Sequence, residues 1–218
     1  MIPIPWFNSM KPSDSLASPL VFAHLSLRWI SRVLLLLMLA SVMSPASAEG
    51  VTKILDDYSD PTRNRCGVER LLIDDRTAGS RSKATVACEN GILRVQGDLV
   101  PGRGVPAFIS QVSLLSPEGK GRDLSGYQGI RLRVKVMKGI LCVQVASTEI
   151  TNFDYHTGAP LSGGRGEFQE VRIPFKDMKR AWSEQKTLNL KTVTSVNLVS
   201  FGMTRDAFAY EVDELGFS

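Results

Sequence analysis

The sequence has few of the residues that carry covalent or metal chemistry. Its 218 residues include three cysteines and two histidines, and no C-x-x-C pair or Cys/His spacing typical of zinc sites occurs. No G-x-S-x-G motif marks a nucleophilic serine. Internal repeats and low-complexity tracts are also absent. These absences argue against a structural zinc site, a serine hydrolase of that type and a repeat protein.

An excess of charge of one sign is also lacking. The chain has 26 basic and 22 acidic residues, and beyond residue 48 these numbers become 23 and 21. Nucleic-acid-binding domains usually carry a clustered basic surface, so no nucleic-acid partner is expected. The hydrophobic content of 43% is ordinary for a globular chain and provides for one domain with a sizeable core.

The only long apolar run lies near the N-terminus. Arg28 and Arg32 precede the run 33–43, and a small-residue Ala-Ser-Ala pattern ends at Ala48. A basic flank, a short apolar core and an A-x-A site predict a secretory signal peptide cleaved after Ala48. We therefore expect an exported protein, periplasmic or secreted, with residues 1–48 as its leader. A mitochondrial presequence and an uncleaved anchor are the alternatives, and only the anchor would make the membrane a partner.

Strand periodicity dominates the remainder, and its clearest instance is the stretch 123–136. A polar turn there leads into alternating apolar and basic residues, which predicts a strand with one face on a core and one face in water. The apolar positions are Ile130, Leu132, Val134 and Val136, and the basic positions are Arg131, Arg133 and Lys135. We expect the basic face to pair across strands with acids such as Glu167 or Glu170. The alternative is a surface that receives an anionic polymer or an acidic partner.

Eight or nine short strands are expected, with almost no helix. Asn90-Gly91 between two apolar runs predicts a tight hairpin. Residues 177–185 form the only convincing helical turn. This pattern predicts an all-β sandwich of the jelly-roll type over residues 67–218, preceded by a polar linker at 49–66. The strands are expected at 69–75, 84–88, 91–96, 108–115, 130–137, 140–147, 167–175, 194–203 and 208–217.

Four motifs occur in an order and spacing similar to the complex I intermediate-associated protein 30 family. They are DLSGYQGIRLRVK (123–135), FDYH (153–156), EFQEVRIPFKDM (167–178) and TSVNLVSFGMTRDAFAYEVDELGF (194–217). Upstream, IDDRTAGSRS (73–82) resembles the family's Asp-Arg-x-x-Gly-Gly-x-Ser motif, although Ser80 stands where a second glycine is usual.

The resemblance implies a non-enzymatic, galactose-binding-type jelly roll. Mitochondrial members of the family hold assembly intermediates of respiratory complex I, which implies a protein-binding or chaperone-like role here. Carbohydrate-binding modules share the fold, so carbohydrate binding is the alternative. Fold analogy alone does not settle function.

The long glycine-rich loop around residues 152–165 holds the candidate ligand contacts. His156, the one histidine beyond residue 48, follows Phe153, Asp154 and Tyr155, and Trp182 is the one tryptophan of that part. The five residues predict a ligand-binding site, since loops on a rigid scaffold often carry function. The alternatives are simple loop packing and, third, a hydrolase in which Asp154 orients His156 as a general base.

The likeness to carbohydrate-binding modules of similar fold implies that paired carboxylates near the two ends of the domain hold a structural calcium ion. Asp74 and Asp75 lie in an early strand, Asp213 lies in the last one, and first and last strands of a jelly roll can be neighbours. Calcium prefers six to eight oxygen ligands. The alternatives are a solvated edge and an ion pair with Arg70 or Arg76. No other cofactor is expected.

The three cysteines allow one disulfide in an oxidising compartment. Cys66 and Cys88 lie at the ends of early segments and are the expected pair. Cys142 falls inside a strand-like run, where it is expected to be a small buried hydrophobic residue.

Overall fold

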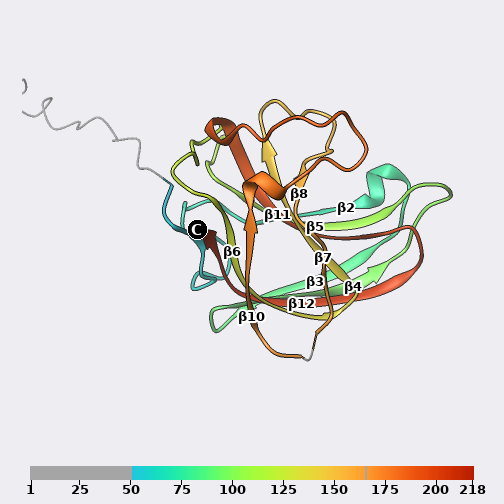
Figure 1. The fold of residues 1–218 in the computed structure, drawn as a ribbon. Helices are drawn as coiled ribbons and strands as arrows, with labels where there is room; N and C mark the ends of the chain where they lie inside the picture. Colours follow the sequence, from blue (N-terminus) through green and yellow to red (C-terminus); the bar gives the residue numbers. More distant parts are fainter. Residues whose placement is uncertain (1–50, 165) are drawn as a thin grey trace, which may run out of the picture. The chain divides into compact units, whose positions relative to one another are not determined.

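Two antiparallel sheets face each other as layers in the computed structural model, which describes residues 51–164 and 166–218 (Figure 1). The expected leader and its cleavage site after Ala48 lie outside the described residues. Within the described part, no helix combines the length and apolar character needed to cross a membrane.

The first sheet has the strand order β10-β6-β12-β4-β3, and β1 pairs with β12 beside this path. All its pairings are antiparallel. Its strands are β1 (Ile54–Asp56), β3 (Lys83–Glu89), β4 (Ile92–Leu99), β6 (Gly129–Lys138), β10 (Gln169–Pro174) and β12 (Asp206–Phe217).

The second sheet has the order β2-β5-β11-β7-β8, with β9 paired to β7. Its strands are β2 (Leu71–Asp74), β5 (Ala107–Leu114), β7 (Ile140–Ser147), β8 (His156–Thr157), β9 (Leu161–Ser162) and β11 (Val193–Gly202). Three short 3-10 helices complete the described part: η1 (Asp75–Ala78), η2 (Phe175–Asp177) and η3 (Leu190–Thr192). The prediction of an all-β sandwich is confirmed.

The alternation of β6 has the predicted register. Ile130, Leu132, Val134 and Val136 are buried in the core cluster, together with residues of the facing sheet such as Val143. Strand β6 lies between β10 and β12, so its apolar face is held on both sides by hydrogen-bonded neighbours. The core expected from the sequence around this strand is therefore present.

The basic face of β6 pairs with β12 rather than with the acids expected at 167–170. Lys135 Nζ lies 2.9 Å from a carboxylate oxygen of Glu211. Arg131 pairs with Glu214 and Arg133 with Asp213. Strand β10 is also beside β6 and places Glu170 opposite Arg133, but Glu170 binds Arg172 of its own strand instead. These pairs match charge along the wet face of the sheet.

Two expectations about secondary structure are wrong. The segment 49–66, expected as a linker, contributes β1 to the first sheet and buries Leu55 and Tyr58. The helical turn expected at 177–185 is instead η2 followed by bends. The backbone amides of Ala181 and Ser183 donate to the Asp154 carboxylate, 27 and 29 residues earlier, and this long-range capture competes with a local helix.

The hairpin predicted at Asn90-Gly91 joins β3 to β4. Both residues have positive φ, 54° and 73°, as a two-residue type I′ turn requires. The turn sets the register in which Glu89 faces Ile92. The local signal was sufficient here because the turn itself determines the pairing of its two strands.

We expect Val134→Asp to unfold the domain. The change places a charge at a position that is 2% exposed, at a cost of more than about 4 kcal/mol. Arg133→Gln, which removes one exposed ion pair, should cost less than about 1 kcal/mol. Urea unfolding followed by circular dichroism measures both. A stable Val134→Asp variant would mean that this face of β6 is not the core face.

Candidate binding sites

Asp154 holds two loops together. Its side chain is 1% exposed, and its carboxylate accepts hydrogen bonds from the backbone N–H groups of Ala181 (2.8 Å), Trp182 (3.1 Å) and Ser183 (2.6 Å). Burial raises the pKa of Asp154, but these hydrogen bonds outweigh burial and hold the pKa below its ordinary value. The carboxylate therefore anchors the segment 180–183 to the loop before β8.

Arg180 strengthens the same junction from the opposite loop. Its guanidinium donates to the carbonyl oxygen of Asp154 (3.1 Å), to the carbonyl oxygen of Glu184 (2.8 Å) and to Oδ1 of Asn152 (3.0 Å). The side chain is 6% exposed, so these bonds form away from water. Asp154 and Arg180 together fix the relative position of the two loops, which Figure 1 shows beside each other near β8.

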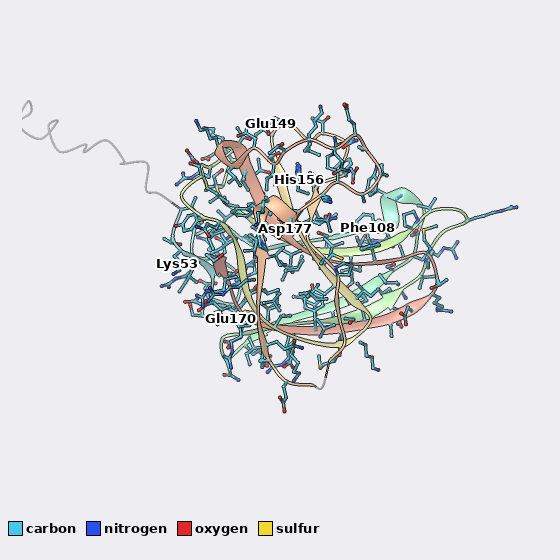
Figure 2. The ribbon with its side chains drawn as sticks, in the orientation of Figure 1. Lys53, Phe108, Glu149, His156, Glu170 and Asp177 are labelled. Carbon is cyan, nitrogen blue, oxygen red and sulfur yellow. The ribbon has the colours of Figure 1, made fainter. Side chains whose placement is uncertain are left out.

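His156 is buried in the same region and takes part in a further loop contact. It is 1% exposed, and its Nε2 lies 2.6 Å from the carbonyl oxygen of Lys186, which requires a proton on Nε2. Its Nδ1 has no hydrogen-bond partner among the described residues. Figure 2 shows His156 in the same upper part of the view as Glu149, where the segments flanking β8 meet. The Asp154 carboxylate and the His156 Nε2 both bond to backbone groups of the opposite loop.

The other three predicted contacts are more open. Phe153 is 74% exposed and Trp182 is 71% exposed, on the two loops that Asp154 joins. Tyr155 is half-buried, and its ring meets that of Phe153 edge-on at 6.3 Å between centroids. Of the five predicted residues, Asp154 and His156 thus hold the two loops together. These loops carry the other three residues, all of them aromatic.

The carboxylates expected to hold calcium have other partners. Asp74 accepts from Arg76 Nε at 2.7 Å, and Asp213 pairs with Arg133. Asp75 is fully buried and accepts from the backbone N–H and hydroxyl of Ser82, at 3.1 and 2.5 Å. In the described residues no group of three or more His, Cys, Asp or Glu side chains is placed to hold a metal ion. The three aspartates do not fit the expected calcium site.

Asp75 and Ser82, two residues of the motif at 73–82, instead fasten this loop to its neighbours. The Asp75 carboxylate also accepts from Phe108 N at 2.9 Å, and the Ser82 hydroxyl accepts from Val100 N at 3.0 Å. Ser80, in place of the usual glycine, accepts from Gly102 N at 2.9 Å. Gly79 alone in this turn has a positive φ, of 89°. The serine is therefore accommodated without backbone strain.

The expected disulfide is not formed, because Cys66 and Cys88 are free thiols. The Cys88 thiol donates to the carbonyl oxygen of Tyr58, 3.4 Å away, instead of bonding to Cys66. Cys142 is buried as expected, and burial raises the pKa of its thiol to about 11. Burial also raises the pKa of Cys66 and of Cys88.

The sequence did not point to β2 as an exposed edge. Leu71, Leu72 and Ile73 are 41, 43 and 47% exposed, and β2 pairs only with β5 in its sheet. In the pairing of β2 with β5, Leu71 lies opposite Val112 and Ile73 lies opposite Ser110, so these side chains are on one face of the sheet. Leu72 lies opposite Gln111, and these two side chains are on the other face. The run of three apolar residues without alternation was the available signal.

A cavity of about 280 Å³ opens between the two sheets behind this edge. Strand β2 provides Leu72, β3 provides Val86, β4 provides Leu93 and β5 provides Gln111. Arg70, which precedes β2, lines the cavity and pairs with Asp56 at 2.6 Å between Nε and Oδ2. The sequence offered no local signal for this pair, because β1 was not recognised as a strand.

Comparison with solved structures identifies the class of fold. A family 11 carbohydrate-binding module of the cellulosomal cellulase Lic26A-Cel5E of Clostridium thermocellum superposes with a TM-score of 0.56 at 15% identity, over 76% of this chain and 92% of that one. The Clostridium thermocellum module in complex with a β-1,3-1,4-mixed-linked tetrasaccharide gives 0.54 at 14% identity, over 76% and 94%. The chain has the jelly-roll fold of these modules, and identities this low show the fold alone.

Sequence comparison then identifies the family. The family model named Complex I intermediate-associated protein 30 (CIA30) matches residues 68–212, more than half of the chain. The chain belongs to the complex I intermediate-associated protein 30 family, as its motifs predicted. Comparison with curated protein sequences gives no match.

We expect Asp154→Asn to destabilise the domain by about 2 kcal/mol at pH 7, because the new amide faces the N–H donors that bound the carboxylate. The folded pKa of Asp154 is depressed, so its stabilisation is complete above the unfolded pKa of about 3.9 and is lost as pH falls through the folded pKa.

The difference in free energy of unfolding between wild type and D154N should therefore become smaller as the pH falls. Urea unfolding at several pH values between neutral and strongly acidic measures it. Asp98→Asn, at an exposed position of β4, is the matched control and should leave stability nearly unchanged. Equal stability of wild type and D154N at pH 7 would contradict the anchoring role.

Proposed function

We propose that this chain is a non-catalytic binding domain that holds a protein partner by adding one of the partner's strands to β2. The observation that carries the proposal is the consecutive exposure of Leu71, Leu72 and Ile73 on a strand with a free edge. Exposed apolar edges are templates for pairing with another chain, and strand addition is a recurring mode of peptide recognition.

Three other edge strands in the described residues, β3, β10 and β8, carry features that oppose such pairing. Strand β3 ends in the exposed charges Lys83 and Glu89. Strand β10 carries Glu170 and Arg172 and ends in a proline, which cannot donate to a ladder. Strand β8 is bridged by Lys179, which exchanges backbone hydrogen bonds with Thr157. Strand β2 presents three consecutive exposed large apolar side chains, whereas the edge strand β3 presents one, Val86, so the contrast favours β2 as the contact surface.

Family membership supports a role in assembly. The family is named for a protein associated with complex I intermediates, and such a role requires stable contacts with other chains rather than catalysis. The use of Asp154 and His156 in loop contacts supports the non-catalytic part of the proposal.

We expect Ile73→Lys to abolish partner capture, because a charge on the edge opposes strand addition. Met137→Lys is the matched control, since Met137 is 39% exposed on a different strand. A photo-crosslinking residue placed at 73 or 137 in the affinity-tagged chain is irradiated in cells, and adducts are identified by mass spectrometry.

We expect crosslinked adducts from position 73 and none from position 137. The partner should co-purify with M137K and should not co-purify with I73K. Adducts of equal yield from both positions, or co-purification unaffected by I73K, would refute docking at β2. Thermal unfolding of both variants checks that the fold is retained.

A second candidate function is carbohydrate binding, favoured by the exposed rings of Phe153 and Trp182. Sugar-binding surfaces use exposed aromatic side chains for stacking, and Asp154 and Arg180 hold the two loops rigidly in place. Rigid presentation lowers the entropy lost on binding. Trp182 is the one tryptophan among the described residues, which makes it a convenient probe.

If this function holds, Trp182→Ala should abolish binding to a glycan that wild type retains on a glycan array. The control is Phe201→Ala, at an aromatic residue that is 44% exposed on β11. No reproducible wild-type signal, or equal signal from W182A, would remove the carbohydrate candidate and leave protein binding.

A further inference from the structure

Two side chains that point into the sandwich are exposed, one on β3 and one on β2. Val86 of β3 lies opposite the core residue Val95, so it is on the inner face of its sheet. Leu72 of β2 lies opposite Gln111, two residues from the core residue Ile109, so it is on the inner face of the other sheet. The Val86 and Leu72 side chains are 40 and 43% exposed, whereas Val95 and Ile109 are each 1% exposed. The sandwich is therefore open between β2 and β3, which Figure 1 shows in different layers, and the cavity of about 280 Å³ has its mouth there.

The free edge of β2 beside this mouth is short. The backbone N–H of Arg70 donates to the carbonyl oxygen of Thr62, so the chain itself occupies the position beside residue 70. Because η1 begins at Asp75, the four residues Leu71–Asp74 are the part of β2 that can pair with a partner. Main-chain hydrogen bonds over so few residues give limited affinity, and strand addition gains its specificity from side-chain pockets beside the edge. The cavity lies where such a pocket is needed.

The walls of the cavity favour an apolar occupant. Hydrocarbon is provided by Leu72, Val86 and Leu93, with Pro61 and Cys88 beside them. An apolar cavity of roughly 150 Å³ holds a benzene ring, so the space of about 280 Å³ accommodates a large apolar side chain. Small-molecule sites usually enclose roughly 300–1,000 Å³, which makes a side chain a better match in size than a cofactor. Filling the cavity would remove its apolar lining from water.

The rim of the cavity is negatively charged. Arg70 is paired with Asp56, at 2.6 Å between Nε and Oδ2, and its charge is thereby compensated. Glu69 also lines the cavity, is exposed to solvent and forms no ion pair within the described part of the chain. A basic group of a partner would therefore complement the rim, whereas an acidic group would be repelled.

We infer that the strand docked at β2 inserts one large apolar side chain, of phenylalanine or leucine size, into this cavity and places a basic residue beside Glu69. The inserted residue is the one opposite Leu72, because an added strand directs that side chain to the inner face, over the mouth. All pairings of this sheet are antiparallel, and Glu69 precedes Leu72, so the basic residue follows the inserted one by about three positions in the partner. The inference rests on the proposed docking at β2 and names the partner sequence that this edge selects.

The first test compares peptides that differ from a reference at one position. The reference is acetyl-Thr-Val-Phe-Val-Thr-Lys-amide, a second peptide has alanine in place of phenylalanine, and a third has glutamate in place of lysine. Each is titrated into the ¹⁵N-labelled full chain, and the backbone amide signals of Leu72 and Val86 are followed. We expect saturable binding of the reference peptide, roughly tenfold or more tighter than that of the alanine peptide, because a large apolar side chain leaves water.

The outcomes separate insertion into the cavity from docking at the edge. Equal affinity of the reference and alanine peptides would leave docking at β2 in place and overturn the inference. A reference peptide that shifts neither signal would also overturn the inference, and docking itself would then be decided by the crosslinking at position 73.

A charge exchange at Glu69 tests the basic residue of the partner without a change in the core. Wild type should bind the reference peptide more tightly than the glutamate peptide, and Glu69→Lys should reverse this order. Glu118→Lys, at an exposed position in the loop after β5, makes the same change in net charge and should bind as wild type does. The same order of affinities in E69K and in wild type would refute the contact with Glu69.

Filling the cavity tests insertion with the natural partner. Val86→Trp should fill the mouth and reduce the crosslinked adducts formed at position 73 in cells roughly tenfold or more. Thr85→Trp, at the exposed neighbouring position of β3, is the control and should leave the yield of adducts unchanged. Thermal unfolding checks that both variants fold, and if V86W does not fold, the comparison of the reference and alanine peptides decides.

The adducts also report the sequence of the partner. We expect them to map to a segment in which a large apolar residue is followed by lysine or arginine. Undiminished adducts in folded V86W would leave docking in place and overturn insertion. Adducts to a segment without a large apolar residue, or to a second copy of this chain, would overturn the inference as well.

Discussion

Burial of one face of β6 is the constraint on which the rest of the domain depends. The strand lies between β10 and β12, with Leu132 and Val134 in the core and Arg133 on the wet face. A slip of one residue would bury the basic face, because side chains alternate along a strand. The cost of burying unpaired charge excludes that slipped register. The positions of the neighbouring strands β10 and β12 follow from the register that remains. The loops that display Phe153 and Trp182 are built on this framework.

Most of the fold was predictable from the sequence because its signals are local. Alternation over 130–136 and the Asn90-Gly91 turn each act within a few residues, and both predictions are confirmed. The two wrong expectations depend on distant groups. Strand β1 has three residues and exists through its pairing with β12, and the segment after η2 is shaped by Asp154. Neither cause can be read from the residues of the segment itself.

The candidate sites were less predictable for the same reason. The sequence drew attention to Asp154 and His156, which the structure places among loop-holding contacts. It could not reveal that β2 is an edge, because exposure depends on the strand order of the sheet. The Arg70–Asp56 pair joins the residue before β2 to β1, a strand that the sequence did not reveal. Chemistry within one loop was visible in the sequence, whereas chemistry assembled between sheets was not.

The burial of the cysteines has a consequence for their reactivity. The thiolate is the reactive form of cysteine, and burial raises the pKa of Cys66, Cys88 and Cys142. All three side chains are therefore held as protonated thiols near neutral pH in the folded domain. Their alkylation and oxidation should accordingly be slow in the folded chain and become fast only where local opening exposes them.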